Sequence, residues 1–473
     1  MSESATEEAL PGDPVPGGRP GEVQQAERLV DELTALGVKG VALCWVDTCG
    51  VTRVKAIPVR RLPSAVRWGI GMSPVFDTFL SDDSIVSSAN LGSPDGDLRL
   101  VPDLAALTPL AGQPGWAWAP VDRMTQDGVP WAVDQRSFAR RMVARAARAG
   151  LRFRAAFEVE WVVGRGDVPD GGFVPACTGP GYSMARLVEL GDYARDVLSA
   201  LEEQGVHVDQ IHPEYAAGQY EVSVGVLDPV GAADRSVLVR QTIRAISQRH
   251  GLRASFAPSV VAGTVGNGGH LHLSAWRDGA NLFAGGDHRY GMTAEAEAFT
   301  AGVLDALPAL CAIATPSPAS YLRLVPSHWS GAYRCWGRET RESALRLVTG
   351  MVGSQGQAAT RELKTADLSA NPYLRVRCVI AAGLDGLDRG LGLPAEITGD
   401  PARYDPAELA ARGVSRLPGT LLEAVAAFEK SAVLTSALGS LGTEAVLAVR
   451  NGEAARFRLM APMDIAAAVR WVF

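Results

Sequence analysis

The sequence is poor in cysteine, and its cysteines are badly spaced for cross-links. Only six occur in 473 residues, and no two of them form a CxxC pair. That spacing argues against a disulfide framework and against a zinc–thiolate site. We therefore expect free thiols in a reducing cytoplasm. The six are Cys44, Cys49, Cys177, Cys311, Cys335 and Cys378.

An excess of basic charge is also missing. Acidic residues outnumber basic ones by 52 to 45, and the formal net charge is −7. This balance argues against a protein that binds nucleic acid or an anionic membrane surface. No stretch reaches about 18 unbroken apolar residues, so we expect no membrane span.

The first residues lack the features of a signal peptide. Residues 1–22 are acidic and rich in proline and glycine, without a basic segment or an apolar core. We therefore expect a disordered tail there, on a protein that stays in the cytoplasm.

What the chain does have is length and a mixed periodicity, which together predict an α+β protein. A chain of 473 residues exceeds a single ordinary core. Residues 23–36 show helical periodicity, and residues 38–59 are typical of a β-hairpin. The remainder up to about residue 125 looks loop-rich, apart from a strand at 98–103. We expect a small β-rich N-terminal domain over residues 23–125.

The larger part of the chain, residues 126–473, alternates helices with strands. After about residue 292 the pattern favours helices separated by loops. We expect a second α+β domain here, built on an antiparallel sheet. Helical periodicity marks residues 136–149, 187–204 and 232–249, and strand patterns mark residues 153–163, 206–215, 218–225 and 268–276.

Two pairs of glutamates are candidates for chemistry. Glu158 and Glu160 lie two apart in an otherwise apolar strand, so both side chains point to one face. Adjacent carboxylates repel each other, so a buried pair needs a cation; the alternative is a solvated edge strand. Glu214 and Glu221 flank the turn AAGQ, and a hairpin there would bring them together. The alternative is two surface glutamates beside a turn.

Imidazole and basic side chains follow the glutamates along the chain. His270, His272 and Ser274 alternate in one strand and share one face. This is a weak metal signal, since a lone histidine is more often a core residue. Glu362 and Lys364 are also two apart, although a surface ion pair would give the same pattern.

A segment after residue 320 concentrates arginines among aromatic residues. Nucleic acid is the competing explanation for such a mixture. Because the whole chain is acidic, we favour a small anionic ligand whose phosphates and carboxylate are held by guanidinium groups. The aromatic residues are Trp329, Tyr333 and Trp336, and the arginines are Arg323, Arg334, Arg338, Arg341 and Arg346.

Together these residues predict a metal-assisted phosphoryl-transfer site. Oxygen-rich clusters with a little imidazole suit Mg²⁺ or Mn²⁺ rather than zinc. Metals and arginines suit transfer from ATP, where catalysis is mostly positioning and charge neutralisation. The sequence contains no GxxxxGK[ST] P-loop and no kinase signature, so the nucleotide must be held in another way.

The order of several motifs resembles the glutamine synthetase superfamily. The motifs are FEVEW, HPEYAAGQYE, GNGGHLHLS, SYLRLVP, RESALR and ELKTADLSANPYL, preceded by VDTCGVTRVKAIP and GDLRLVPDL. The match spans roughly residues 25–473 and is loose after about residue 390. It implies a β-grasp-like N-terminal domain and a catalytic domain on a curved antiparallel sheet flanked by helices. It also implies a ring-shaped homo-oligomer, expected as a dodecamer of two hexameric rings with active sites between neighbours.

The resemblance also implies roles for single residues. By matching position, Glu160, Glu214 and Glu221 are ligands of one metal, and Glu158, His270 and Glu362 are ligands of a second. Arg341 and Arg346 correspond to phosphate-binding arginines, Arg323 to the arginine that holds the α-carboxylate of glutamate, and His272 and Ser274 to the ATP site. The implied cofactors are ATP and two or more Mg²⁺ or Mn²⁺ ions. ATP would convert a carboxylate to an acyl phosphate, from which an amine displaces phosphate.

Departures from the family pattern concern the amine. Trp329 stands where ammonia-using members carry a glutamate that closes over the site and helps deprotonate ammonium. Their Asp-Gly-Ser-Ser segment is also missing, and only Asp77, Asp82 or Asp83 is available to substitute. A site without both anions should bind ammonium poorly. An indole instead offers apolar surface and a cation–π face to an organic ammonium.

Two further departures concern the acid. Lys364 replaces a family arginine and loses its bidentate geometry. Val265 replaces an asparagine that helps frame glutamate. These changes put glutamate itself in doubt, but Arg323 keeps an anchor for a carboxylate.

We therefore predict an ATP-dependent ligase that joins a glutamate-like acid to an organic amine and releases ADP and phosphate. The alternatives are a glutamine synthetase that uses ammonia, an inactive scaffold that binds metal and ATP, and another ATP-dependent transfer on the same architecture. The expected partners are small molecules, with no nucleic acid and no membrane. The catalytic residues are expected to be Arg323, Trp329, Arg341 and Lys364.

Overall fold

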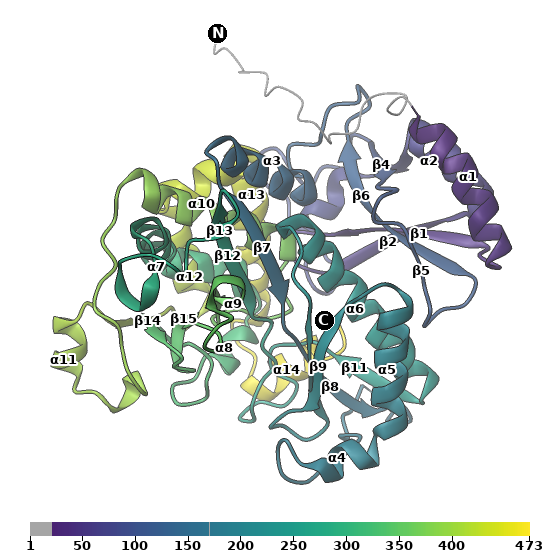
Figure 1. Ribbon diagram of the computed structural model, residues 1–473. Coiled ribbons are helices and arrows are strands. Elements are labelled where there is room, and N and C mark those ends of the chain that lie inside the picture. Colours follow the sequence, from purple (N-terminus) through teal and green to yellow (C-terminus); the bar gives the residue numbers. More distant parts are fainter. Residues whose placement is uncertain (1–20, 170) are drawn as a thin grey trace.

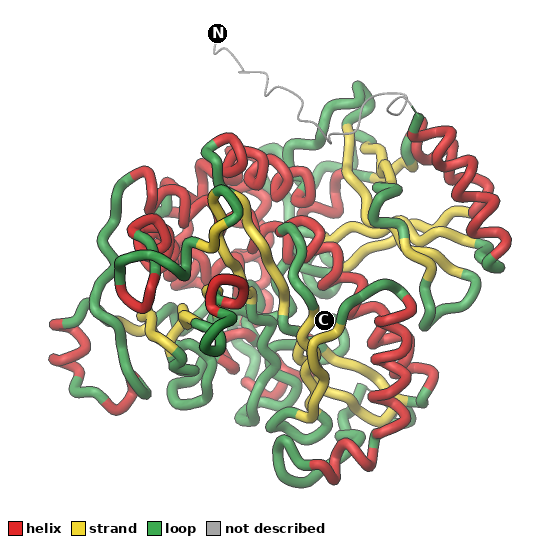
Figure 2. Tube along the Cα trace, viewed as in Figure 1, coloured by secondary structure: helices red, strands yellow, loops and turns green. Residues whose placement is uncertain are grey.

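The structure is a computed structural model that describes residues 21–169 and 171–473. The tail expected over residues 1–22 therefore lies outside the described residues, apart from its last two. A smaller N-terminal part lies beside a larger part that carries most of the helices (Figure 1). Strands occur in both parts and helices surround those of the larger part (Figure 2), which confirms the predicted α+β class.

The N-terminal part is built on one six-stranded sheet. Its elements are α1 (Glu22–Ala35), β1 (Gly40–Val46), β2 (Thr52–Pro58), η1 (Val59–Arg61), α2 (Leu62–Trp68), β3 (Ile70–Met72), η2 (Pro74–Thr78), β4 (Leu98–Pro102), β5 (Thr108–Pro109) and β6 (Trp116–Met124). The strand order is β2-β1-β6-β4-β3, with β5 paired to β6. β1 and β2 form the expected hairpin, and β1 runs parallel to β6.

The strand β6 corrects the expectation that the chain is loop-rich up to residue 125. It lies in the middle of the sheet, between β1 and β4. All of its residues after Trp116 are buried, so the strand shows no alternation of apolar and polar positions. A strand that is covered on both faces lacks the period-2 signal on which sequence-based prediction depends. The helix α2 was missed as well.

The larger part contains two sheets and many helices. Its strands are β7 (Arg152–Phe157), β8 (Val159–Arg165), β9 (Val208–Pro213), β10 (Gln219–Val224), β11 (Leu252–Ser255), β12 (Leu271–Arg277), β13 (Ala280–Asn281), β14 (Tyr333–Arg338), β15 (Ser343–Val348), β16 (Thr360–Leu363) and β17 (Ser415–Arg416). Its helices are α3 (Gln135–Arg148), α4 (Met184–Glu189), α5 (Gly191–Glu203), α6 (Pro229–Arg249), η3 (Arg289–Gly291), α7 (Ala294–Ala314), α8 (Ser320–Arg323), α9 (Gln355–Ala358), α10 (Pro372–Asp388), η4 (Pro401–Arg403), α11 (Pro406–Ala411), α12 (Leu421–Glu429), α13 (Ala432–Phe457) and α14 (Pro462–Val469).

The two sheets of the larger part are mostly antiparallel. One has the order β11-β8-β10-β9, and the other has the order β13-β12-β16-β15-β14-β17 with β7 paired to β12. Only β14 and β15 pair in parallel within these sheets. The strands β14 to β17 also correct the expectation of helices and loops alone after residue 292.

The strand expected over residues 153–163 is divided between the two sheets. It breaks at Glu158, so that β7 pairs with β12 in one sheet and β8 pairs with β10 in the other. The N–H of Glu158 donates to the carbonyl oxygen of His270 at 3.0 Å and keeps the break close to β12. Glu158 therefore stands at the point where the two sheets meet.

The two parts are joined through a buried arginine, Arg136 on α3. Its guanidinium contacts Asp103 at 2.7 Å and Asp122 at 3.1 Å in the N-terminal part, and Asp234 of α6 at 2.8 Å. The expected domain boundary at residues 125/126 falls in the loop between β6 and α3. The division into two domains at this point remains a prediction.

Two helices within the described residues are long and apolar enough to cross a membrane, judged by length and composition. They are α7 and α13, and the core helix of a globular protein passes the same test. In α7 the most apolar window is 78% buried inside the protein, and in α13 it is 39% buried. α7 is thus a core helix, whereas one side of α13 is more open.

The side chain of Asp77 is fully buried inside the N-terminal part. It accepts from Arg123 Nη1 at 2.6 Å and from Trp131 Nε1 at 2.7 Å, and Arg123 is also fully buried. Asp77 is therefore engaged within its own chain, which leaves Asp82 and Asp83 as the more accessible of the three aspartates. Asp82 and Asp83 are more exposed and pair with Arg456 and Arg53.

Replacing Asp77 with alanine should destabilise the protein by about 3–5 kcal/mol, because it leaves the buried Arg123 without part of its counter-charge. Urea denaturation followed by circular dichroism measures the change. The matched control is Asp83→Ala, whose side chain is 67% exposed and pairs with Arg53. An exposed pair contributes at most about 1 kcal/mol. Equal losses in the two variants would show that the burial of Asp77 does not matter.

Candidate active site

A cavity of about 950 Å³ lies between the two sheets of the larger part. Most of its buried lining residues lie on or beside strands β8, β9, β10, β12 and β16 and form the floor, and the exposed Trp329, in the segment after α8, lies at the mouth. All of the predicted site residues except Ser274 line it: Glu158, Glu160, Glu214, Glu221, His270, His272, Arg323, Trp329, Arg341, Arg346, Glu362 and Lys364. Segments far apart in the sequence thus meet in one place.

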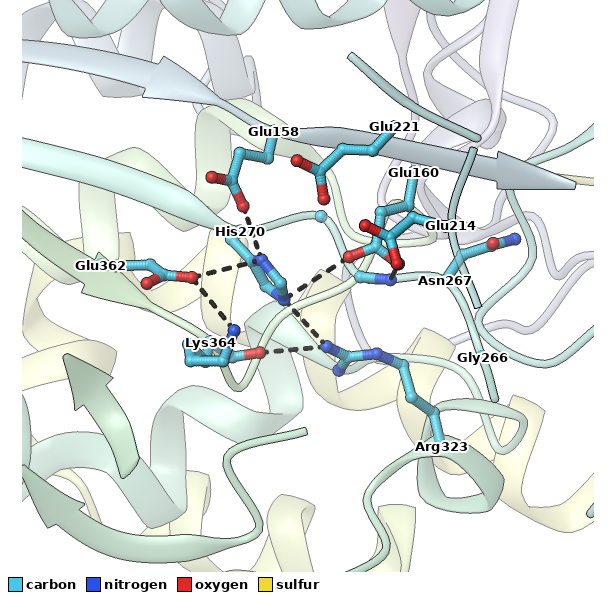
Figure 3. Close-up of polar contacts among 12 residues, drawn as sticks. Glu158, Glu160, Glu214, Glu221, Gly266, Asn267, His270, Arg323, Glu362 and Lys364 are labelled. Atoms are coloured by element: carbon cyan, nitrogen blue, oxygen red, sulfur yellow. Dashed lines mark hydrogen bonds and ion pairs between the residues drawn. The ribbon is translucent and has the colours of Figure 1, made fainter. Parts of the chain in front are cut away.

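The first acidic group surrounds Glu158, where β7 passes into β8. Glu158 Oε2 lies 2.8 Å from His270 Nδ1, and its Oε1 lies 2.9 Å from His272 Nε2. Glu362 Oε1 lies 3.3 Å from His270 Nδ1. Figure 3 shows the carboxylates of Glu158 and Glu362 approaching the same ring nitrogen of His270. Burial opposes ionisation of Glu158, but His272 and His270 hold its pKa well below the ordinary value.

The second acidic group lies on the hairpin of β9 and β10. Glu221 pairs across the hairpin with His212, whose Nε2 lies 3.4 Å from Glu221 Oε1 and whose Nδ1 lies 3.4 Å from Glu214 Oε1. Glu160 joins them from β8, directly opposite Glu221. Burial raises the pKa of Glu160 and of Glu221 to about 7. Carboxylates gathered in this way call for a cation.

The donor atoms fit hard divalent cations. One oxygen or nitrogen from each of Glu158, His272 and Glu362 lies within 4.8 Å of the others, and His212, Glu214 and Glu221 form a second such set. Carboxylate oxygens with a little imidazole suit Mg²⁺ or Mn²⁺. The grouping differs in detail from the expectation, because His272 takes the place of His270 in the first set and His212 takes the place of Glu160 in the second. His212 was missed, although it precedes Glu214 by two residues and shares its strand face.

Basic side chains flank the first acidic group. Lys364 Nζ and Arg346 Nη1 each donate to Glu362, both at 3.1 Å. Burial opposes ionisation of Glu362, but Lys364 and the neighbouring imidazoles lower its pKa to about 2. Arg346 Nη2 also donates to Glu339 at 3.1 Å. Glu362 is therefore ionised. The guanidinium of Arg346, which lines the cavity, is held in place by two carboxylates, Glu362 and Glu339.

Arg323, at the end of α8, has one guanidinium nitrogen to spare. Its Nη2 lies 3.2 Å from both His270 Nε2 and the carbonyl oxygen of Lys364. Its Nη1 is buried and has no hydrogen-bond partner among the residues that the structure describes. An unpaired buried donor is costly, so Nη1 is suited to a ligand acceptor.

Aromatic rings form one side of the cavity mouth. Trp329, which is 44% exposed, meets Tyr215 edge to face with ring centroids 5.4 Å apart. Tyr182 lies 5.4 Å from Tyr215 and stacks on His212 at 5.1 Å. The O–H of Tyr182 also donates to Glu214. An aromatic rim thus passes directly into the acidic floor. No local sequence pattern indicated that these tyrosines belong to the site.

Ser274 is placed differently from its predicted role at the ATP site. It is buried, accepts from Trp276 Nε1 at 2.8 Å, and does not line the cavity. Val265, by contrast, lines the cavity and is partly exposed. Arg341 lies 5.7 Å from the Trp329 ring, so a predicted phosphate ligand and the predicted amine-side residue are neighbours.

Comparisons with known proteins place this site in a family. Residues 25–131 match the model described as glutamine synthetase N-terminal domain, and residues 132–466 match glutamine synthetase, catalytic domain. The chain is 64% identical over 462 residues to a gamma-glutamylpolyamine synthetase of Streptomyces coelicolor, covering 98% of this chain and 99% of the relative.

Solved structures agree with this result. A crystal structure of a novel glutamine synthase homolog is 32% identical and superposes with a TM-score of 0.82, covering 92% of this chain and 99% of that one. A GmaS/ADP complex is 27% identical, with a TM-score of 0.79 and coverage of 92% and 97%.

Proposed function

Because the chain belongs to the glutamine synthetase family, we propose that it is an ATP-dependent ligase that joins a glutamate-like carboxylate to an organic amine. ADP and phosphate are the other products. The observation that carries the proposal is a single cavity in which an aromatic rim leads to an acidic floor. We infer that the amine is a polyamine, because the relative that is 64% identical is named for that substrate.

The acid binds through Arg323 and is activated beside Arg341 and Arg346. A carboxylate resists attack by a nucleophile, since the attack adds a second negative charge. Phosphorylation by ATP removes this obstacle by providing a phosphate leaving group. The guanidinium groups of Arg341 and Arg346 neutralise charge on the phosphates as it develops. The free Nη1 of Arg323 holds the carboxylate that does not react.

The acidic floor would hold two or more Mg²⁺ or Mn²⁺ ions. Glu158, His270 and Glu362 would hold one ion, with His272 close by, and Glu160, Glu214 and Glu221 would hold another, with His212 close by. When bound, the ions screen the triphosphate and the acid carboxylate from each other. Lys364 keeps Glu362 ionised and thus ready to bind.

The amine substrate contacts the aromatic rings of Trp329, Tyr215 and Tyr182. Aromatic faces attract an organic ammonium by cation–π interaction and also pack against its methylene groups. An ammonium ion has no apolar part and gains less from this wall. The aromatic rim thus favours an organic amine over the ammonia of the alternative function.

We also propose that the protein assembles into a ring-shaped homo-oligomer, two stacked hexameric rings in the form that the family resemblance implies, and works in the cytoplasm. The open side of α13 is available for contacts with other subunits. Light scattering after size-exclusion chromatography measures the mass of the assembly.

A phosphate-release screen tests the proposed function directly. The protein is incubated with ATP, Mg²⁺ and glutamate, and with ammonium, methylamine, putrescine or spermidine in turn. The di- and polyamines should give the highest kcat/KM. If ammonium exceeds every organic amine, the protein is a glutamine synthetase and the assignment of the aromatic rim is wrong.

Replacing Trp329 with glutamate should move the preference toward ammonia. The new carboxylate would attract ammonium, while the lost indole costs the organic amine about 1 kcal/mol or more of cation–π attraction. We expect kcat/KM to rise about fivefold for ammonium and to fall at least about tenfold for putrescine, as measured by phosphate release. The matched control is Trp68→Glu, an exposed tryptophan of α2 in the N-terminal part. No gain with ammonium would count against the role of Trp329.

A further inference from the structure

The loop that carries Trp329 has an unusual backbone. Residues 325–331, named here the tryptophan loop, contain two non-glycine residues with positive φ, Ser327 at 60° and Trp329 at 54°. Such residues are uncommon in the left-handed region, and they stay there only where the surroundings hold them. The indole of Trp329 therefore depends on contacts that hold its backbone.

The contact that holds Trp329 comes from Glu342, which directly precedes β15. Glu342 Oε1 accepts a hydrogen bond from the backbone N–H of Trp329 at 2.8 Å. The side chain of Glu342 is only 6% exposed, and it does not line the cavity. A second carboxylate, Asp400, accepts from Ser327 Oγ at 2.6 Å. Each strained residue of the loop is thus tied to one carboxylate.

Glu342 uses only one of its two oxygens. Its Oε2 is buried and has no hydrogen-bond partner in the described part of the chain. The charged groups facing the carboxylate are Lys364, His328 and Asp400. Because Oε2 has no donor to lose, a glutamine in this place keeps the bond to Trp329 without breaking another. Glutamine thus removes the negative charge of Glu342 and keeps its acceptor oxygen, so this substitution distinguishes the two roles.

The backbone of Trp329 determines where its indole points. In the observed conformation the ring stands 5.4 Å from Tyr215 and 5.7 Å from the guanidinium of Arg341. Leaving the left-handed region would redirect the Cα–Cβ bond and carry the indole away from Tyr215. The aromatic rim of the cavity would then be open on the side of the tryptophan loop.

We propose that Glu342 is a positioning residue that fixes the indole of Trp329 at the cavity mouth and thereby sets the preference for organic amines over ammonium. The inference rests on the proposed function. It adds a residue outside the cavity to those that select the amine. The role needs the acceptor oxygen of Glu342 and not its charge.

The experiment compares Glu342→Leu and Glu342→Met with Glu342→Gln. Leucine and methionine fill the buried space without an acceptor, whereas glutamine retains one. Two acceptor-free variants are used so that a folding failure of one leaves the other, and melting temperatures identify the folded proteins. The matched control is Glu444→Ala, which removes a carboxylate bond of 2.7 Å to the N–H of Asn90, and neither of these residues lines the cavity.

The readout is the ratio of kcat/KM for putrescine to that for ammonium, with KM for ATP measured alongside. Leucine and methionine should lower the ratio about tenfold, which is the upper range expected for the loss of one hydrogen bond. Glutamine should restore it to within about twofold of the unsubstituted protein, and KM for ATP should not move. The control should leave every value unchanged.

Two results would overturn the inference. An unchanged ratio in the folded leucine or methionine variant would show that the bond does not position the indole. Equal loss with both amines in the glutamine variant would show that the carboxylate acts through its charge, for example as a proton acceptor. Failure of the proposed function is recognised separately, because the unsubstituted protein would then show no preference for putrescine over ammonium.

Discussion

Replacing Glu160 with glutamine should reduce phosphate release by about a thousandfold, a loss of the size seen when one group that stabilises charge in a transition state is removed. Glu160 is 8% exposed, and its charged neighbours include Arg323 and Glu214. Its Oε2 accepts from the N–H of Gly268 at 2.8 Å and from Gln219 at 3.1 Å. Glutamine has the same shape but lacks the charge that balances Arg323 and attracts a divalent cation.

Two measurements test the role of Glu160. Steady-state phosphate release gives the activity, and Mn²⁺ titration followed by electron paramagnetic resonance gives the number and affinity of bound cations. At least one cation should bind about tenfold or more weakly in the variant. Glu203→Gln, an exposed glutamate at the end of α5, is the control. Activity above about a tenth of the original, with unchanged Mn²⁺ binding, would remove Glu160 from the ligands.

Replacing Arg323 with lysine should lower kcat/KM for the acid substrate about a hundredfold and leave KM for ATP within about twofold. The reason is the buried Nη1, which has no partner in the described residues and is placed for a carboxylate. Lysine keeps the positive charge, but its single ammonium group cannot replace the contacts of Nη2 with His270 and Lys364 and also reach the carboxylate as Nη1 does.

A substrate without the α-carboxylate distinguishes loss of carboxylate binding by Arg323 from a general destabilisation of the variant. 4-Aminobutyrate should be a poor substrate for the unsubstituted protein, and Arg323→Lys should lower its kcat/KM by less than about twofold, since the contact is already missing. Arg334→Lys, on β14 outside the cavity, controls for the exchange itself. A penalty that is the same for glutamate and 4-aminobutyrate would show that Arg323 does not hold the α-carboxylate.

The sequence predicted the larger elements and missed those without a clear periodicity. The hairpin of β1 and β2, the helix α3 and the hairpin of β9 and β10 all follow from local patterns. The strand β6 did not, because it is buried on both faces. The division of residues 153–163 between two sheets also escaped prediction, since the partner of each half lies elsewhere in the chain.

For the site, too, local patterns predicted some features and missed others. The turn between β9 and β10 brought Glu214 near Glu221 as expected, whereas the strand break at Glu158 puts Glu158 and Glu160 in different acidic groups despite their period-2 spacing. Ser274 shares a strand with His272, yet it does not line the cavity, and its hydroxyl accepts a hydrogen bond from Trp276. Spacing tells which side chains share a face, but what covers that face depends on other segments.

What the sequence determined by itself is the kind of chemistry: carboxylates, imidazoles and arginines in an order that resembles one family. Only the tertiary structure decided which of them meet, that His212 joins Glu214 and Glu221, that Asp77 is enclosed in the N-terminal part, and that Glu342 holds the backbone of Trp329. The physical reason is range. Strand alternation and hairpin geometry act over a few residues, whereas burial and hydrogen bonds join residues that are distant in the chain, and no local pattern encodes their partners.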